Sequence, residues 1–169
     1  MNGDLIPVSW LASAVLLALL ASGPAVAASK GEVMRMVSEE AARNHRVPIA
    51  LALAVAKVES DFNDQAISSA GARGVMQISP RTALAEFGAA AEQLMDPETN
   101  VKLGVAYLER LFDQYGQDWE LALSHYNGGR LRSNQGRFVA HSSTRRYVDS
   151  VIRWSQSYQA GAGEARMAW

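Results

Sequence analysis

Residues 47–59 have the sequence VPIALALAVAKVE, which is apolar at every position except Pro48, Lys57 and the final Glu59. Counted from Leu51, positions i, i+4 and i+7 are all apolar, and Glu59 follows at i+8. If the run is helical, Glu59 ends its apolar stripe instead of facing water. The fold is therefore expected to form around a nearly apolar central helix that ends in a carboxyl group.

A carboxyl group in this position has a predictable chemistry. Contact with apolar atoms removes water from the charged form, so the pKa of Glu59 is expected to rise and the group to hold a proton at neutral pH. A protonated carboxyl group at neutral pH is what a general acid requires. Glu59 is thus the first candidate for a catalytic residue.

Length and composition indicate one compact domain. The chain has 169 residues, 49% of them hydrophobic, which suffices for one core and is short for two. It has no cysteine, so packing and not disulfides must stabilise it.

The first residues resemble a secretory leader. Residues 10–21 are uncharged and apolar, and Ala25-Val26-Ala27 is a small-x-small cleavage site. We therefore expect residues 1–27 to be a signal peptide and residues 28–169 to be a periplasmic or secreted domain. The leader carries Asp4 and no Lys or Arg, so an uncleaved N-terminal membrane anchor is the alternative.

Charge is balanced overall but not along the chain. Without Asp4, 16 basic and 16 acidic side chains remain. Between residues 130 and 153 only Asp149 opposes the arginines, which are Arg130, Arg132, Arg137, Arg145, Arg146 and Arg153. This segment is expected either to attract an anionic polymer or to be a solvated surface without a partner. No nucleic-acid motif accompanies it, so nucleic acid is not an expected partner.

Periodicity and capping residues predict a mainly α-helical domain. Helices are expected over residues 30–44, 48–60, 80–87, 97–115 and 118–126, and from Thr144 to about residue 158. Residues 61–79 predict loops with a short irregular or β excursion after the central helix, and the Arg- and Ser-rich stretch to Ser143 predicts a loop. The core is expected over about residues 33–154, with a frayed tail at 159–169.

Other catalytic constellations are not found in the sequence. His45, His125 and His141 do not form a ligand pair, so we expect neither a metal site nor a cofactor. Ser142 and Ser143 beside His141 lack the surroundings of a catalytic nucleophile. Glu59 remains the leading candidate.

Four motifs occur in the order of a known family. They are Glu59-Ser60-x-Phe62 with Ala66-x-Ser68 and Gly71-Ala72-x-Gly74-Val75-Met76-Gln77-Ile78-x-Pro80-x-Thr82-Ala83, then Asn100-Val101-x-x-Gly104-x-x-Tyr107-Leu108, then Ala122-Leu123-x-x-Tyr126-Asn127-x-Gly129, and last Tyr147-Val148-x-x-Val151. Together they resemble the soluble lytic transglycosylases, enzymes with a lysozyme-like fold that cleave peptidoglycan.

The resemblance implies a mechanism with a single carboxyl group. Glu59 matches the family's sole catalytic acid, which protonates the bond between N-acetylmuramic acid and N-acetylglucosamine. The substrate's acetamido group supports the cationic carbon, and the C6 hydroxyl closes a 1,6-anhydro ring. Most glycosidases instead use two carboxylates.

The resemblance also implies a set of substrate-binding residues. Ser68 and Gln77 match positions that contact the sugar, Tyr126 matches a tyrosine near the reaction centre, and Asn127 supports it. Met76 is placed to desolvate Glu59. Three residues also have ordinary structural interpretations: Met76 as core, Asn127 as a helix-terminus cap and Ser68 as a turn hydroxyl.

The chain departs from the family after the third motif. Many members have Tyr-Asn-Ala-Gly-Pro where this chain has Tyr126-Asn127-Gly128-Gly129-Arg130. We hypothesise that Arg130 and Arg132 engage lactyl or peptide carboxylates of the wall polymer.

The resemblance leaves alternatives open. One is a hydrolytic muramidase on the same fold, in which Asp61 or Asp64 holds a water. Another is a catalytically silent wall-binding assembly protein. The small size resembles members that open the wall for secretion, pilus or flagellar machines, so such an apparatus is a possible partner, and we expect a monomer.

Overall fold

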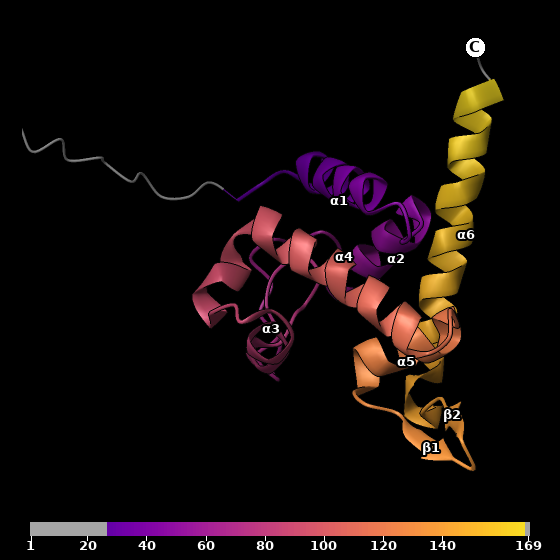
Figure 1. Ribbon diagram of the computed structural model, residues 1–169. Helices are drawn as coiled ribbons and strands as arrows, with labels where there is room; N and C mark the ends of the chain where they lie inside the picture. The colour runs from indigo at the N-terminus through magenta and orange to yellow at the C-terminus, as the bar shows by residue number, and fades with distance from the viewer. Residues whose placement is uncertain (1–26, 168–169) are drawn as a thin grey trace, which may run out of the picture.

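The computed structural model of the protein describes residues 27–167, with side chains described up to residue 162 (Figure 1). The predicted leader therefore lies almost wholly outside the described residues. Within them, no helix combines the length and the apolar character needed to cross a membrane.

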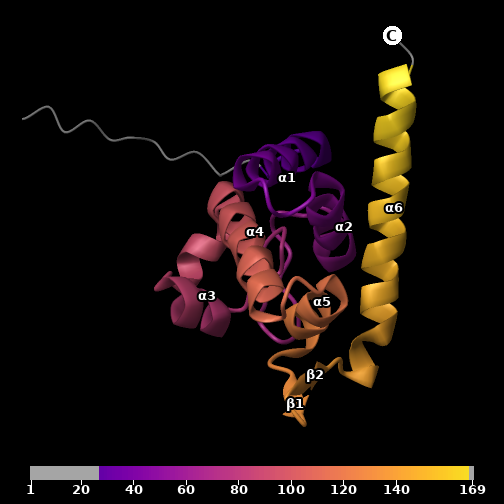
Figure 2. The same ribbon diagram turned by 45° about the vertical axis from the view of Figure 1, so that its right-hand side comes forward.

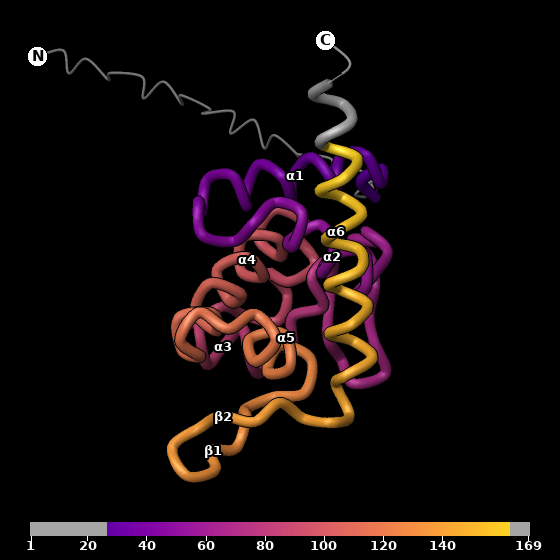
Figure 3. The backbone as a smooth tube through the Cα atoms, turned by 90° about the vertical axis from the view of Figure 1, so that its right-hand side faces the viewer, coloured from indigo at the N-terminus to yellow at the C-terminus, as the bar shows by residue number. Residues whose placement is uncertain are grey.

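The apolar stretch forms the central helix, as predicted. Helix α2 (Ile49–Ser60) buries the six consecutive residues from Leu51 to Ala56. It packs against α1 (Lys30–Asn44) on one side and α6 (Arg145–Met167) along its length, and the three views agree on this arrangement (Figures 1, 2 and 3). Helix α4 (Pro97–Gln114) crosses between α1 and α5 (Trp119–Gly128) and closes the other side of the core.

The helix starts follow from capping chemistry. Asp96 and Asp118 accept from the backbone N–H groups of Thr99 and Leu121, at 2.8 and 3.0 Å, and so cap α4 and α5 as predicted. Ser79 caps α3 (Pro80–Phe87), which has the predicted bounds. A 3-10 helix, Ala91–Met95, precedes α4.

Residues 61–79 form the irregular excursion that the sequence predicted. It consists of turns joined by two isolated β-bridges, from Arg73 to Ile67 and to Ile78. The fully buried side chain of Asn100 in α4 binds it by accepting from Met76 N at 2.7 Å and donating to the carbonyl of Arg73 at 2.8 Å. The same amide also donates to the carbonyl of Leu94 at 2.9 Å.

The prediction of a loop up to Ser143 was wrong in part. Strands β1 (Arg132–Asn134) and β2 (Arg137–Val139) form an antiparallel hairpin there. Its two-residue turn places Gln135 at φ 49° and Gly136 at φ 78°, the backbone that tight hairpins require. All six strand residues are exposed, so the alternation that marks a half-buried strand is missing from the sequence.

The predicted end of the last helix was also wrong. Helix α6 continues through Tyr158 to Met167 and projects beyond the rest of the molecule (Figures 1 and 2). Ala, Glu, Arg and Met in this stretch favour helix enough to offset its two glycines.

Candidate active site

Glu59 lies at the end of α2, in the last turn of the central helix. Burial raises the pKa of its carboxyl group to about 7, and the hydrogen bond from the Tyr147 hydroxyl opposes the rise. That hydroxyl donates to Glu59 Oε1 at 2.7 Å. The carboxyl group therefore exchanges a proton in the neutral range, as the sequence predicted on the ground of desolvation.

Tyr126 comes to the same region from α5. Its hydroxyl donates to the carbonyl oxygen of Met76 at 2.9 Å. Burial, and next the charge of Glu59, raises the pKa of Tyr126 well above its ordinary value, so the phenol stays protonated. Tyr126 thus binds the segment after α2 while lying within the electrostatic reach of the acid.

Met76 is wholly buried between these elements. Its N–H is held by Asn100 and its carbonyl by Tyr126. Gly104 of α4 lies so close that a Cβ there would be 2.5 Å from the Met76 Cβ. Met76 is therefore a core residue with a fixed backbone, which was one of its two interpretations.

Gln77 adopts φ 47°, a left-handed backbone that turns its side chain back on the chain. Its Nε2 donates to the carbonyl groups of Ala66 and Gly74, at 3.1 and 3.0 Å. Both amide protons are therefore used within the protein, and the side-chain oxygen is the atom left to accept from a ligand.

Ser68 and Asn127 are placed differently from each other. The Ser68 hydroxyl accepts from the backbone N–H of Ala72 at 3.0 Å and so stabilises a turn. Asn127 is exposed near the end of α5. This contact agrees with the interpretation of Ser68 as a turn hydroxyl. The proton of the Ser68 hydroxyl is not used in it and stays available to a ligand.

A cavity of about 280 Å³ opens beside these residues. Three of the predicted site residues, Gln77, Tyr126 and Asn127, are in its wall, with Ser79 and Tyr107. Ser68, Met76 and Glu59 do not line it. Tyr126 thus meets the backbone at Met76, next to Gln77, while three of the six predicted residues line the cavity and three do not.

The two other carboxylates near Glu59 are engaged elsewhere. Asp61 pairs with Lys57 and with Lys30, the latter at 2.8 Å, and these hydrogen bonds lower the pKa of Asp61 to about 2. Asp64 is buried and accepts from the backbone N–H of Ala28 at 2.9 Å. Neither contacts the Glu59 carboxyl group.

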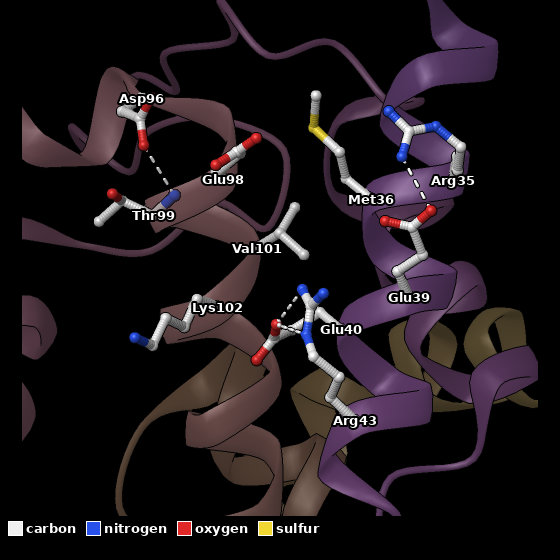
Figure 4. A pocket seen from close by; sticks show the side chains of 10 residues that line it. All are labelled: Arg35, Met36, Glu39, Glu40, Arg43, Asp96, Glu98, Thr99, Val101 and Lys102. Carbon is white, nitrogen blue, oxygen red and sulfur yellow. Dashed lines mark hydrogen bonds and ion pairs between the residues drawn. The ribbon is translucent and has the colours of Figure 1, made fainter.

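A more strongly charged hollow lies between α1 and the start of α4 (Figure 4). Two acid–base pairs lie in this hollow, Arg35 with Glu39 at 2.8 Å and Arg43 with Glu40 at 2.6 Å. None of the predicted site residues lines it. Among the side chains described, which end at residue 162, no three His, Asp or Glu are grouped to hold a metal ion.

The sequence matches the family described as the transglycosylase SLT domain over residues 36–147, more than half of the chain. The chain belongs to this family. The predicted resemblance is thereby confirmed.

Similar proteins show how much of a longer protein this chain corresponds to. The soluble lytic murein transglycosylase of Escherichia coli K12 is 32% identical over 139 residues, covering 70% of this chain and 22% of that protein. A transglycosylase of Enterobacteria phage PRD1 is 33% identical over 103 residues, covering 61% of this chain and 36% of the phage protein. The chain thus spans about a fifth of the length of the first relative.

Solved structures of SLT relatives have the same fold. An inactive mutant of lytic transglycosylase Slt from Pseudomonas aeruginosa superposes with TM-score 0.65 and 27% identity, covering 76% of this chain and 24% of that one. The 70-kDa soluble lytic transglycosylase in complex with bulgecin A gives TM-score 0.64 and 28% identity, with the same coverage of 76% and 24%. The mainly helical, lysozyme-like fold is therefore confirmed.

One contact of this SLT site was missed from the sequence. Tyr147 belongs to the fourth motif, but its sequence position does not show that its hydroxyl reaches Glu59, which lies 88 residues earlier. A signal was present, since Tyr147 and Val148 begin the apolar face of the last helix at its first turn. Pairing that helix with the central one would have brought the phenol to the acid.

Proposed function

We propose that this SLT-family chain is a lytic transglycosylase that cleaves the β-1,4 bond between N-acetylmuramic acid and N-acetylglucosamine in peptidoglycan. The observation that carries the proposal is one buried carboxyl group with a pKa of about 7, hydrogen-bonded to a phenol. At neutral pH such a group can donate a proton in one step and accept one in the next.

The proposed reaction begins with protonation. Glu59 gives its proton to the glycosidic oxygen, the bond from that oxygen to C1 of the muramic residue breaks, and the N-acetylglucosamine 4-hydroxyl leaves. The carbonyl oxygen of the 2-acetamido group bonds to C1 and stabilises its positive charge. Glu59 is then a carboxylate, which the Tyr147 hydroxyl stabilises as a donor.

The second step closes the anhydro ring. The Glu59 carboxylate accepts the proton of the C6 hydroxyl, O6 bonds to C1, and the bond from the acetamido oxygen to C1 breaks. The products are a 1,6-anhydro-muramic end and a free N-acetylglucosamine 4-hydroxyl, and Glu59 is protonated again. The side-chain oxygen of Gln77 is suited to accept from the acetamido N–H, because both Gln77 amide protons are already used.

The arrangement of carboxylates favours this reaction over hydrolysis. A retaining or inverting hydrolase uses a second carboxylate as nucleophile or as base for water. Asp61 is held by two lysines and Asp64 by the backbone of Ala28. Both are bonded to other partners, so neither supports the muramidase alternative.

The decisive experiment is mass spectrometry of the soluble products from purified peptidoglycan. We expect residues 28–169 to release fragments with 1,6-anhydro ends, and Glu59→Gln to release none. Ends with a reducing sugar would make the protein a hydrolase. A folded wild-type protein that releases nothing would favour the silent wall-binding alternative.

We further propose that the protein acts on the wall after export, as a monomer, in local remodelling. The apolar segment at residues 10–21 and the cleavage site at Ala27 support export, and an uncleaved anchor is the alternative. The mass of the purified mature chain by light scattering tests the monomer. Co-purification from cells with secretion, pilus or flagellar components tests the proposed association with such a machine.

A further inference from the structure

A second cavity, of about 320 Å³, adjoins the one beside Gln77 and Tyr126. The two have Thr82, Tyr107, His125 and Gly129 in common, so they form one groove with a shared wall. Beyond that wall the second cavity is lined by Arg81 and Glu86 of α3 and by Arg130 after α5. The groove therefore leads from the candidate active site to two guanidinium groups.

The second cavity carries an excess of positive charge. Arg81 and Arg130 form no ion pair with any residue that the structure describes. Glu86 is the acid on the wall, and its Oε2 is 3.3 Å from Nη1 of Arg110, which also donates to the Glu86 carbonyl. Because Arg110 already compensates Glu86, the charges of Arg81 and Arg130 remain for a ligand.

The shared wall is fixed by aromatic side chains. The Tyr115 hydroxyl accepts from the backbone N–H of Leu131 at 3.3 Å and lies 2.7 Å from His125 Nδ1. His125 Nε2 lies 3.4 Å from the Tyr107 hydroxyl, so the ring is held between two tyrosine hydroxyls. Burial and the nearby charge of Arg130 lower the pKa of His125, which keeps the ring neutral. The side chains of the shared wall are therefore held in place, and they carry no charge.

We propose that this second cavity is an anion subsite in which Arg81 and Arg130 bind a carboxylate of the peptide stem carried by the glycan strand. The inference rests on the proposed function and adds to it a preference for stem-bearing over bare glycan. Guanidinium groups suit this role because their N–H donors match the two oxygens of a carboxylate. It also changes the hypothesis made from the sequence, since Arg81 and not Arg132 shares the cavity with Arg130.

The test compares glycan substrates that differ in their carboxylates. Three preparations are used: intact strands with peptide stems, strands stripped of stems by an amidase, which keep a lactyl carboxylate, and intact strands whose carboxylates are amidated. We expect Arg81→Gln/Arg130→Gln to raise KM on intact strands roughly three- to tenfold, the modest effect of exposed ion pairs. On amidated strands the variant should match wild type. The proposal would be overturned if the variant matched wild type on all three preparations. It would also be overturned if the variant lost as much activity on amidated strands as on intact strands.

The stripped strands identify the source of the carboxylate. If the loss disappears on them, the stem supplies it, and if the loss persists, the lactyl group does, which would overturn the assignment to the stem. Arg132→Gln/Arg137→Gln is the matched control, because it removes the same charge from the exposed hairpin without touching the cavity.

A binding measurement separates this inference from the proposed function. In the Glu59→Gln background, co-sedimentation with insoluble peptidoglycan needs no turnover. Weaker binding after Arg81→Gln/Arg130→Gln, seen with intact and not with amidated wall, supports the subsite even if wild type cuts none of the strands. Unchanged binding rejects the subsite even if wild type produces anhydro ends.

Discussion

The Glu59 carboxyl group weakens the folded state at the pH at which we propose that it works. Its pKa is about 7 in the folded protein and near the ordinary value of 4.5 in the unfolded chain. Between these values the folded state binds more protons than the unfolded state, so stability falls as pH rises. The full contribution of the protonated group is present below about pH 4.5 and is lost as pH passes through 7.

We therefore expect Glu59→Gln to be more stable than wild type at pH 8 by about 2–3 kcal/mol, with the difference shrinking toward zero near pH 4. Urea unfolding of both proteins across this range measures the effect. Glu92→Gln, at an exposed position, controls for the loss of a carboxylate. A constant difference at every pH would mean that the pKa of Glu59 is not raised by folding.

Tyr147→Phe should move the activity profile to higher pH. The Tyr147 hydroxyl lowers the pKa of Glu59 by donating to it, so its removal raises that pKa further. Turnover at pH 6 should fall roughly tenfold because the carboxyl group also loses its orienting partner. A pH–rate profile that falls uniformly without shifting would show a structural role only.

At this scale the sequence predicts the acid better than its surroundings. An apolar run that ends in a carboxyl group is local information, and it was enough to predict the raised pKa of Glu59. The contact with Tyr147 depends on how two helices far apart in sequence pack, and the engagement of both Gln77 amide protons depends on a left-handed backbone. Neither of these two features can be inferred from a local sequence pattern. The roles of Ser68, Gln77, Tyr126 and Asn127 toward substrate stay predictions.

Among the elements, α4 holds the site segment in place through one side chain. Asn100 binds backbone groups of Arg73, Met76 and Leu94, and it is fully buried. Asn100→Ala leaves these groups without partners and should lower the free energy of unfolding by about 3 kcal/mol. Chemical denaturation measures this loss, with the exposed Asn134→Ala as control. A loss below about 1 kcal/mol would mean that water replaces the amide.

Contact between α4 and Met76 gives a second prediction at this scale. Gly104→Ala places a methyl group 2.5 Å from the Met76 Cβ and should cost about 1–3 kcal/mol through overpacking. Gly31→Ala in α1 meets nothing within 4 Å and should be neutral or stabilising by up to about 1 kcal/mol. Thermal melting of the two variants tests this prediction. An equal change in melting temperature for both would indicate that helix propensity alone is responsible.

Elements with polar caps were predicted closely, while the hairpin was not. Ser79, Asp96 and Asp118 begin helices through bonds to their own neighbours, so the sequence carries the signal. The hairpin of β1 and β2 has no buried face and depends on the turn at Gln135 and Gly136. An Arg- and Ser-rich composition favours a loop, and the turn overrides it.

The whole molecule is built on α2, and the end of α6 lies outside that core. The described side chains of residues 159–162 are exposed. We expect deletion of residues 160–169 to cost less than about 1 kcal/mol of stability and to leave activity unchanged. Urea unfolding and product release measure both quantities. Loss of cooperative unfolding would show that the last turns of α6 belong to the folding unit.

The helix that carries Tyr147 also sets the order in which the site is completed as the chain is made. The hydrogen bond between Tyr147 and Glu59 joins residues 88 positions apart, and Tyr147 enters with the last helix. Until α6 packs on α2, the Glu59 carboxyl group is less buried than in the finished fold, so its pKa is expected to lie nearer the ordinary value of a glutamate. We therefore expect a partly synthesised chain to lack the protonated carboxyl group on which the proposed reaction depends. Completion of the fold would then determine when the proposed activity first appears.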